Sequence, residues 1–242
     1  MDRVDITMTA VIRPKILTRC LESIKRKIVK DQTNFRLIIN VDPIGENTKP
    51  GKVVKLAQKF FDNVIYNIPK EPSFPKAVKW VWSQSDAPYV FHIEDDWVFN
   101  EDIDIDNMVK ILRGNVKLSS LRLYKYNTPN RKKFPTFGCY WVYNPDGFYL
   151  SKDWKKQFGL NPILIKKEFI DQALPLMVDN VNPEKQFRES QKYMRKVIKD
   201  WQYGMYTNPG GRALVTDIGR GWIKNTKFAK PKTGTFLTWE TK

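Results

Sequence analysis

The chain has 242 residues, enough for one large α/β domain that needs no disulfide bonds. Its 42 Lys and Arg residues against 26 Asp and Glu give a formal net charge of +16, a field that attracts polyanions. His92 is the only histidine, and Cys20 and Cys139 are the only cysteines. This composition excludes histidine-rich and Cys/His metal sites and leaves a Ser-His-Asp triad one candidate base. Nucleic acid is the leading acidic partner; the alternative is a basic protein with no such partner.

The amino-terminal half alternates strand and helix patterns, which is typical of a mainly parallel sheet. In chain order, we expect a strand at 4–12, a helix of about four turns at 14–28, strands at 35–41, 63–68 and 89–93, and helices through 54–60 and 77–82. A turn at 42–45 begins with Asp42, and an acidic segment follows the strand at 89–93. Because ligands of open α/β sheets bind beyond the carboxyl ends of strands, both places are candidate binding positions.

The carboxyl-terminal half is less regular. We expect a strand at 118–124, two extended pieces around the Asn-Pro-Asp-Gly turn in 140–150, helices at 163–178 and 184–200, and short strands and glycine-rich loops after 200. No linker or internal repeat interrupts the chain, so we expect a single domain. No segment has the pattern of a signal peptide or a membrane span, which predicts a cytoplasmic protein without integral membrane contact.

The segment 94–106 contains seven acidic residues and no Lys or Arg. Like charges at a strand end repel one another unless a cation neutralises them, and carboxylate oxygens without soft ligands favour Mg²⁺ or Mn²⁺. If the strand continues to residue 96, Glu94 and Asp96 point to one side and Asp95 to the other. The acids at 102, 104 and 106 have a simpler interpretation, since acidic residues stabilise the amino terminus of a following helix.

Three segments together resemble the A-type glycosyltransferases: Val11-Ile12-Arg13-Pro14, Asp42 after the second strand, and Phe91-His-Ile-Glu-Asp-Asp-Trp97. The resemblance implies an α/β fold with a central mixed, mostly parallel sheet flanked by helices. It also implies an acidic "DxD" motif that binds a divalent metal and a nucleoside diphosphate sugar, here in the variant form that begins with Glu94. The residues that it assigns are Glu94 and Asp96 as ligands of Mn²⁺ or Mg²⁺, and Val11, Arg13, Asp42 and Asp95 as contacts of the nucleotide. For Arg13, a surface cation is the alternative.

The same resemblance suggests the remaining site residues. An acceptor hydroxyl needs a base, usually a carboxylate; Glu184 is the first candidate and Asp200 the second, although either fits an ordinary helix end. The segment 210–222 resembles a flexible loop that closes over the donor, in which Arg212 or Arg220 would clamp phosphate oxygens. Relatives often have a metal-binding histidine there, and Asp217 is the available substitute. The alternative for this segment is a plain glycine-rich connection.

Basic and aromatic residues alternate in the half that should bind the acceptor. The basic members are Arg122, Lys125, Arg131, Lys132 and Lys133, and the aromatic members are Phe134, Phe137, Tyr140, Trp141 and Tyr143. Further lysines follow Arg220, at positions 224, 227, 230, 232 and 242. Cations and aromatic faces are typical of nucleic-acid binding, although such aromatic residues also occur in cores and in sugar sites.

We therefore predict one glycosyltransferase domain over 1–242, in which 1–100 binds the nucleotide sugar, with UDP-sugars favoured, and 101–242 binds the acceptor. The favoured acceptor is DNA with hydroxymethylated pyrimidines, which would make the chain similar to bacteriophage base-modifying glycosyltransferases, located in the host cytoplasm. The alternatives are a transferase acting on cell-surface glycan or protein, a non-catalytic nucleic-acid-binding protein, and, less favoured, a metal-dependent nuclease.

Overall fold

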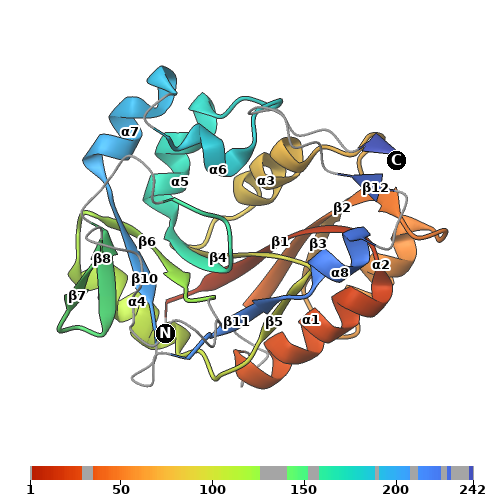
Figure 1. The fold of residues 1–242 in the computed structure, drawn as a ribbon, viewed down its shortest axis with the longest axis horizontal. Helices are drawn as coiled ribbons and strands as arrows, with labels where there is room; N and C mark the ends of the chain where they lie inside the picture. Colours follow the sequence, from red (N-terminus) through yellow and green to blue (C-terminus); the bar gives the residue numbers. More distant parts are fainter. Residues whose placement is uncertain are drawn as a thin grey trace.

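The computed structural model describes residues 2–28, 35–125, 141–151, 158–188, 191–207, 212–224, 228–229 and 240–241 (Figure 1). Within these residues, the main sheet has nine strands in the order β3-β2-β1-β4-β9-β6-β10-β8-β7. Its strands are β1 (Val4–Ile12), β2 (Phe35–Gly45), β3 (Val64–Asn67), β4 (Tyr89–Glu94), β6 (Leu118–Leu123), β7 (Trp141–Asn144), β8 (Phe148–Ser151), β9 (Ile163–Lys166) and β10 (Gln202–Tyr206). The predicted mixed, mostly parallel sheet is confirmed.

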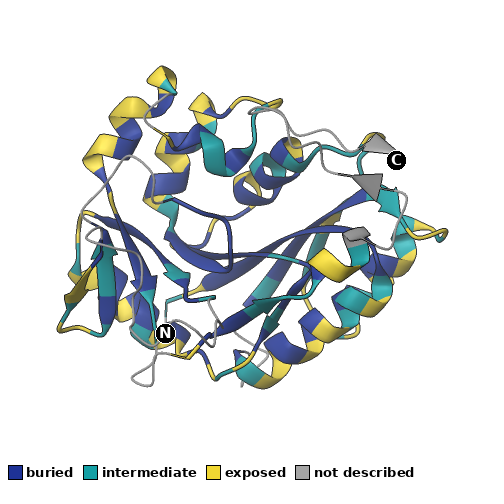
Figure 2. Ribbon diagram, viewed as in Figure 1, coloured by how far each residue is buried: buried dark blue, intermediate teal, exposed yellow. Residues whose placement is uncertain are grey.

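Helices cover both faces of this sheet (Figures 1 and 2). One face carries α1 (Pro14–Lys27), α2 (Pro50–Ala57) and α4 (Ile105–Gly114). The other face carries α3 (Phe74–Ser83), α5 (Lys167–Ala173), α6 (Pro183–Gln186) and α7 (Arg195–Asp200), with the short 3₁₀ helices η3 (Leu174–Leu176) and η4 (Lys192–Met194) between them. Each face has its own apolar core cluster, so the central strands are buried on both sides, as parallel sheets require.

The predictions for the first half are largely confirmed, because a helix with a periodic apolar face and strands with continuous apolar runs leave little ambiguity. β1 has its predicted bounds, and α1 starts at Pro14, whose missing N–H is not needed at a helix start. The acidic residues after the motif have structural roles. Asp104 caps the amino terminus of α4, as predicted, by accepting from the Asn107 N–H at 2.9 Å, and Asp102 pairs with Lys27 at 3.0 Å.

The predicted turn at 42–45 is wrong, because β2 continues to Gly45 through a bulge. Val11 pairs with Asp42, but the next residue, Ile12, pairs with Gly45. Gly45 has φ 136°, and a Cβ there would lie 2.2 Å from the Ile12 carbonyl oxygen, so only glycine fits. Asp42 therefore lies where the regular pairing between β1 and β2 ends and the bulge begins.

The helix prediction for 163–178 is wrong over its first four residues. Residues Ile163–Lys166 form β9, which runs antiparallel between β4 and β6, and α5 ends at Ala173, two residues before Pro175. The predicted helix at 184–200 is likewise divided into α6, η4 and α7. In β9, pairing on both edges overrides a local pattern that also fits a helix.

Candidate active site

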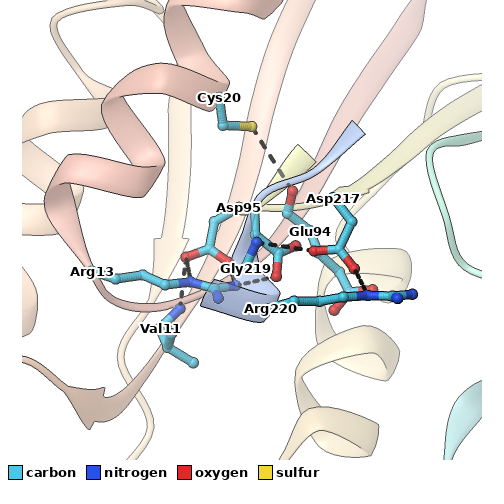
Figure 3. Close-up of polar contacts among 9 residues, drawn as sticks. Val11, Arg13, Cys20, Glu94, Asp95, Asp217, Gly219 and Arg220 are labelled. Atoms are coloured by element: carbon cyan, nitrogen blue, oxygen red, sulfur yellow. Dashed lines mark hydrogen bonds and ion pairs between the residues drawn. The ribbon is translucent and has the colours of Figure 1, made fainter. Parts of the chain in front are cut away.

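The acidic motif lies in a tight turn after β4, between β4 and the short strand β5 (Trp97–Phe99). Here the Asp95 carboxylate accepts three hydrogen bonds: from the Val11 N–H at 3.2 Å, from the Arg13 Nε at 2.9 Å, and from the Arg13 Nη2 (Figure 3). Asp95 is 1% exposed. These contacts connect the end of β4 to the end of β1, so Asp95 fixes the shape of the turn.

Arg13 is buried, which excludes its interpretation as a surface cation. Its Nη2 also contacts Asp96 Oδ2 at 2.9 Å, and its guanidinium carbon lies 5.4 Å from the ring centroid of Trp222. Burial opposes the charge, but the carboxylates of Asp95 and Asp96 outweigh it and hold the pKa of Arg13 above its ordinary value. Asp95 and Asp96 thus converge on one guanidinium, because β4 ends at Glu94 and the strand alternation that would separate them stops there.

The segment 212–224 is a strand and a helix where a flexible loop was expected. The strand β11 (Val215–Asp217) pairs with β5, and the Ile218 N–H donates to the Asp96 carbonyl oxygen at 2.9 Å. The helix α8 (Gly219–Lys224) then begins against the motif. A Cβ on Gly219 would lie 2.0 Å from Asp96 Oδ2 and 2.9 Å from Arg13 Nη1. This contact depends on glycine; Gly210 and Gly211 lie outside the described residues.

The remaining predicted residues of this segment have partners of their own. Asp217 accepts from the Gly219 N–H at 2.9 Å and from the Arg220 Nε at 3.0 Å. Arg212, which is exposed, pairs with Glu101 at 3.4 Å. The structure therefore turns Asp217 toward the start of α8, where it pairs with the largely exposed side chain of Arg220.

The donor atoms of the acidic side chains at this turn decide whether they fit a divalent ion. Among the described residues, no three acidic, His or Cys side chains form a group that could hold a metal by themselves. Mg²⁺ and similar ions, however, are commonly held by one or two carboxylates while substrate phosphates and water complete the shell. Asp95 and Asp96 both contact Arg13, and Asp217 contacts Arg220. Their carboxylate oxygens are the donor type that such an ion prefers, and Glu94 and Asp96, on either side of the buried Asp95, would hold it together with a diphosphate.

Asp42 lies at the bulge in β2, where it pairs with Val11 of β1. Its carboxylate accepts from Asn40 Nδ2 at 2.9 Å and from the Ser73 N–H at 3.1 Å. Asn67 Nδ2 in turn donates to Asn40 Oδ1 at 2.7 Å, so three elements orient this carboxylate. Asp42 is 3% exposed, and burial raises its pKa to about 6, against the two hydrogen bonds and together with the nearby charge of Asp95. The sequence pattern does not single out Asn40, although it lies two residues before Asp42 on the same face of β2.

The raised pKa of Asp42 predicts a pH dependence of stability. Between the ordinary pKa and about 6, the folded chain binds the proton and the unfolded chain does not, so this group lowers the free energy of unfolding as pH rises. In an Asp42→Asn variant this contribution is absent. We expect the free energy of unfolding of the variant, relative to wild type, to increase by about 2 kcal/mol from pH 4 to pH 7 in denaturant titrations. An unchanged difference across this range would contradict the assignment.

Glu184 and Asp200, the two candidate bases, lie at opposite ends of the central strands. Glu184 Oε1 accepts from the Leu160 N–H at 2.7 Å, in the segment that leads into β9 next to the end of β4. Asp200 is exposed and precedes β10, which starts level with Leu118 at the start of β6. At the rise of a strand, this position is about 20 Å below the level of the acidic motif. A catalytic base must come within hydrogen-bond reach of the acceptor. At this distance from the acidic motif, Asp200 does not fit the role of the base.

The described part of the basic and aromatic set lies at the carboxyl end of β6. The guanidinium carbon of Arg122 lies 4.8 Å from the ring centroid of Trp141, and Lys125 Nζ lies 5.4 Å from that of Trp97. Outside the described residues are Arg131, Lys132, Lys133, Phe134, Phe137, Tyr140 and the lysines at 227, 230, 232 and 242. In the part of the chain that the structure describes, no helix has the length and apolarity needed to span a bilayer.

This chain resembles known proteins in its fold but not in its sequence. The chain matches no protein-family model and no curated protein sequence. Solved structures do resemble it. TarS of S. aureus is 12% identical with a TM-score of 0.60, over 89% of this chain and 36% of TarS. The 1–349 fragment of TarS in complex with UDP-GlcNAc is 11% identical with a TM-score of 0.59, over 88% of this chain and 58% of the fragment.

A third structure gives the same result. The mannosyltransferase PcManGT from Pyrobaculum calidifontis, in complex with GDP-Man and Mn²⁺, is 12% identical with a TM-score of 0.59, over 97% of this chain and 59% of PcManGT. The chain thus spans between 36% and 59% of the length of these three structures. The arrangement shared with them is the mixed sheet flanked by helices on both faces. This chain therefore has the A-type glycosyltransferase fold.

Proposed function

We propose that the chain is a glycosyltransferase that moves a sugar from a nucleoside diphosphate to a hydroxyl acceptor. The observation that carries this proposal is the acidic turn after β4, which is held to β1 by Arg13, is closed by β11 and α8, and lies near Asp42 at the end of the β1–β2 pairing. Within A-type folds, such an arrangement suits a nucleotide on the β1–β2 side and a diphosphate beside the acids. The UDP-GlcNAc and GDP-Man complexes of the structural neighbours support the same class of donor.

In the transfer step, the acceptor oxygen forms a bond to the anomeric carbon while the bond from that carbon to the diphosphate breaks. The diphosphate leaves with the electron pair, and the proton of the acceptor hydroxyl passes to the Glu184 carboxylate. A Mn²⁺ or Mg²⁺ ion held by Glu94 and Asp96 would supply positive charge to the leaving group. Arg220 adds a cation from α8, and Val11 and Asp42 contact the nucleotide. Arg13 and Asp95 act by holding the turn.

The finer proposal concerns the acceptor and the donor. We propose hydroxymethylated pyrimidines in DNA as acceptor and UDP-sugars as donors, with 1–100 as the donor half and 101–242 as the acceptor half of one domain. The net charge of +16 and the cations at the end of β6 support a polyanionic acceptor. A base in duplex DNA would have to be flipped out to reach Glu184, at a cost of a few kcal/mol that basic contacts can offset. The cytoplasmic location stays a prediction.

The test is release of nucleoside diphosphate from a panel of UDP- and GDP-sugars with Mn²⁺, with and without hydroxymethylated DNA. We expect release that rises with the modified DNA and falls at least about 1000-fold in an Asp96→Asn variant, because one of the two proposed metal ligands loses its charge. Asp62→Asn, at an exposed position, is the matched control and should keep wild-type activity. Release without stimulation by DNA would move the acceptor to glycan or protein. No release from any donor would reject the transferase.

A further inference from the structure

The outer side of α1 and α2 is a charged surface on one face of the sheet. The two helices pack against each other, and their apolar residues, among them Leu17, Leu21 and Val53, face the core (Figures 1 and 2). Every exposed residue of α1 and α2 is charged. Glu22 is acidic, and the other six are cations: Lys15, Arg19, Lys25, Arg26, Lys52 and Lys55. We call these six cations the α1–α2 surface.

The α1–α2 surface holds its positive charges close together without acidic partners. Among the residues that the structure describes, none forms an ion pair with any of the six cations. Lys15 and Arg19 are four residues apart on α1, and Lys52 and Lys55 are three residues apart on α2, so like charges are neighbours on both helices. Such pairs destabilise a helix. An anion that binds across the surface relieves this repulsion.

The third helix on this face, α4, has balanced charge. Its exposed charged residues are Asp106, Lys110 and Arg113, and Arg113 pairs with Asp2. Two cations are thus matched by two nearby acids. The excess of positive charge on this face therefore belongs to α1 and α2.

Both helices of the α1–α2 surface start at the edge of the sheet that carries the acidic turn. α1 begins directly after Arg13, which contacts that turn. α2 begins five residues after Gly45, at the bulge that follows the pairing of β1 with β2. Lys15 and Lys52 lie in the first turns of their helices, and the other four cations follow toward the opposite end. A partner that lies along α1 therefore reaches the edge where the proposed transfer takes place.

The chemistry of the α1–α2 surface fits nucleic acid better than a lipid bilayer. A helix that lies in a bilayer interface buries an apolar face in the lipid, but the apolar faces of α1 and α2 are already in the core. α1 has 14 residues and is about 21 Å long. Over that length a DNA duplex carries about 12 phosphate charges, and about half of them are on the side that faces a protein. This number is close to the number of cations on the surface.

We propose that the α1–α2 surface binds the phosphate backbone of duplex DNA, outside the candidate active site and within residues 1–100, the half that the proposed function assigns to the donor. The choice of DNA rests on the proposed acceptor, although binding of unmodified DNA requires no transfer. Contacts with phosphates fix the position of a duplex and carry no sequence information. The surface thus holds the duplex along the protein while the acceptor base is presented at the edge of the sheet.

The test is the salt dependence of binding to an unmodified DNA duplex, measured by fluorescence anisotropy with the full chain. The variant combines Lys15→Gln, Arg19→Gln, Lys52→Gln and Lys55→Gln. We expect the slope of log K against log salt concentration to become less steep by about 3, because each neutralised phosphate contributes about 0.9 to it. The affinity at about 0.1 M salt should fall at least about 100-fold. Thermal melts should show a folded variant that is at least as stable as wild type, because like-charge repulsion is removed.

The matched control removes four cations from the other face of the sheet. It combines substitutions at exposed positions of η4 and α7, namely Lys192→Gln, Arg195→Gln, Lys196→Gln and Lys199→Gln. Because both variants have the same net charge, the control should keep the wild-type slope if the DNA lies on α1 and α2. An equal loss in both variants, an unchanged slope in the first variant, or no DNA binding by the wild-type chain would overturn the proposal.

Vesicle binding and transfer assays separate the remaining outcomes. If the chain binds vesicles that contain phosphatidylserine, the first variant does not, and the DNA slope is unchanged, then the partner is a lipid surface and the proposal is wrong. With hydroxymethylated DNA as acceptor, the first variant should raise KM for DNA and keep the wild-type kcat. The expected change in slope in a chain that transfers no sugar would reject the transferase function and still support the DNA-binding surface. The two failures are therefore distinguishable.

Discussion

Replacement of Arg13 by alanine is expected to lower the melting temperature by about 10 °C. The variant leaves Asp95 buried with the Val11 N–H as its remaining partner among those described above, and removing one partner of a buried ion pair costs about 3–5 kcal/mol. For a chain of this size, each kcal/mol corresponds to about 2–4 °C. Transfer activity should also be lost, because Asp95 and Asp96 would no longer be held together. Differential scanning calorimetry measures the stability effect.

The matched control is Arg19→Ala, at an exposed position on α1, the helix that follows Arg13. For this variant we expect the melting temperature to change by less than about 2 °C. Arg13→Lys is expected to fall between the two, because an ammonium cannot form the paired contacts of Arg13 Nε and Nη2 with Asp95. Arg13→Ala with a melting temperature equal to that of Arg19→Ala would show that the buried pair contributes nothing to the fold.

The second large effect is expected from Gly219→Ala. The added Cβ would overlap Asp96 Oδ2, so either the carboxylate or the start of α8 must move. We expect kcat/KM to fall about 100-fold, because displacements near 1 Å in a reacting site have effects of this size. Gly219 has an ordinary negative φ, and alanine favours helices more than glycine, so the backbone itself tolerates the change. Steady-state kinetics with the donor identified by the panel measures the loss.

Gly221→Ala provides the control within the same helix. No atom lies within 4 Å of a Cβ at Gly221, so this variant should keep wild-type kcat/KM and a melting temperature equal to or slightly above that of wild type. If both variants transfer sugar at the wild-type rate, the contact between α8 and the acidic turn has no role in transfer. If both lose activity, the cause lies in α8 as a whole and not at Asp96.

The fold of the first half of the chain could be predicted from the sequence because its signals are local. Continuous apolar strands such as 4–12 and the periodic helix after Pro14 each specify one structure. β9 could not be predicted in this way, since Ile163-Leu-Ile fits a strand or a helix and only the pairing with β4 and β6 decides. The turn at Asp42 was wrong for a related reason, because the bulge depends on Ile12 in the neighbouring strand.

The candidate site, like the fold, could be predicted only where its signals are local in the sequence. The position of Glu94, Asp95 and Asp96 at a strand end follows from the buried strand before them. The partners of these acids do not, because Arg13 and Gly219 come from segments far apart in the chain, and nothing local marks either as a contact of the turn. The choice between Glu184 and Asp200 likewise needed the register of the strands, which places them at opposite ends of the central strands.

The pairing of β5 with β11 also has a consequence for the order of folding. The acidic turn and the segment that closes it are distant in sequence, so their contact has a high loop-closure entropy and forms slowly compared with the neighbouring β1–α1–β2 unit. During synthesis, the first strands and helices can pack while the later segment is still absent. We therefore expect the end of the sheet that carries the acidic turn to be assembled last, after the strands and helices that support it.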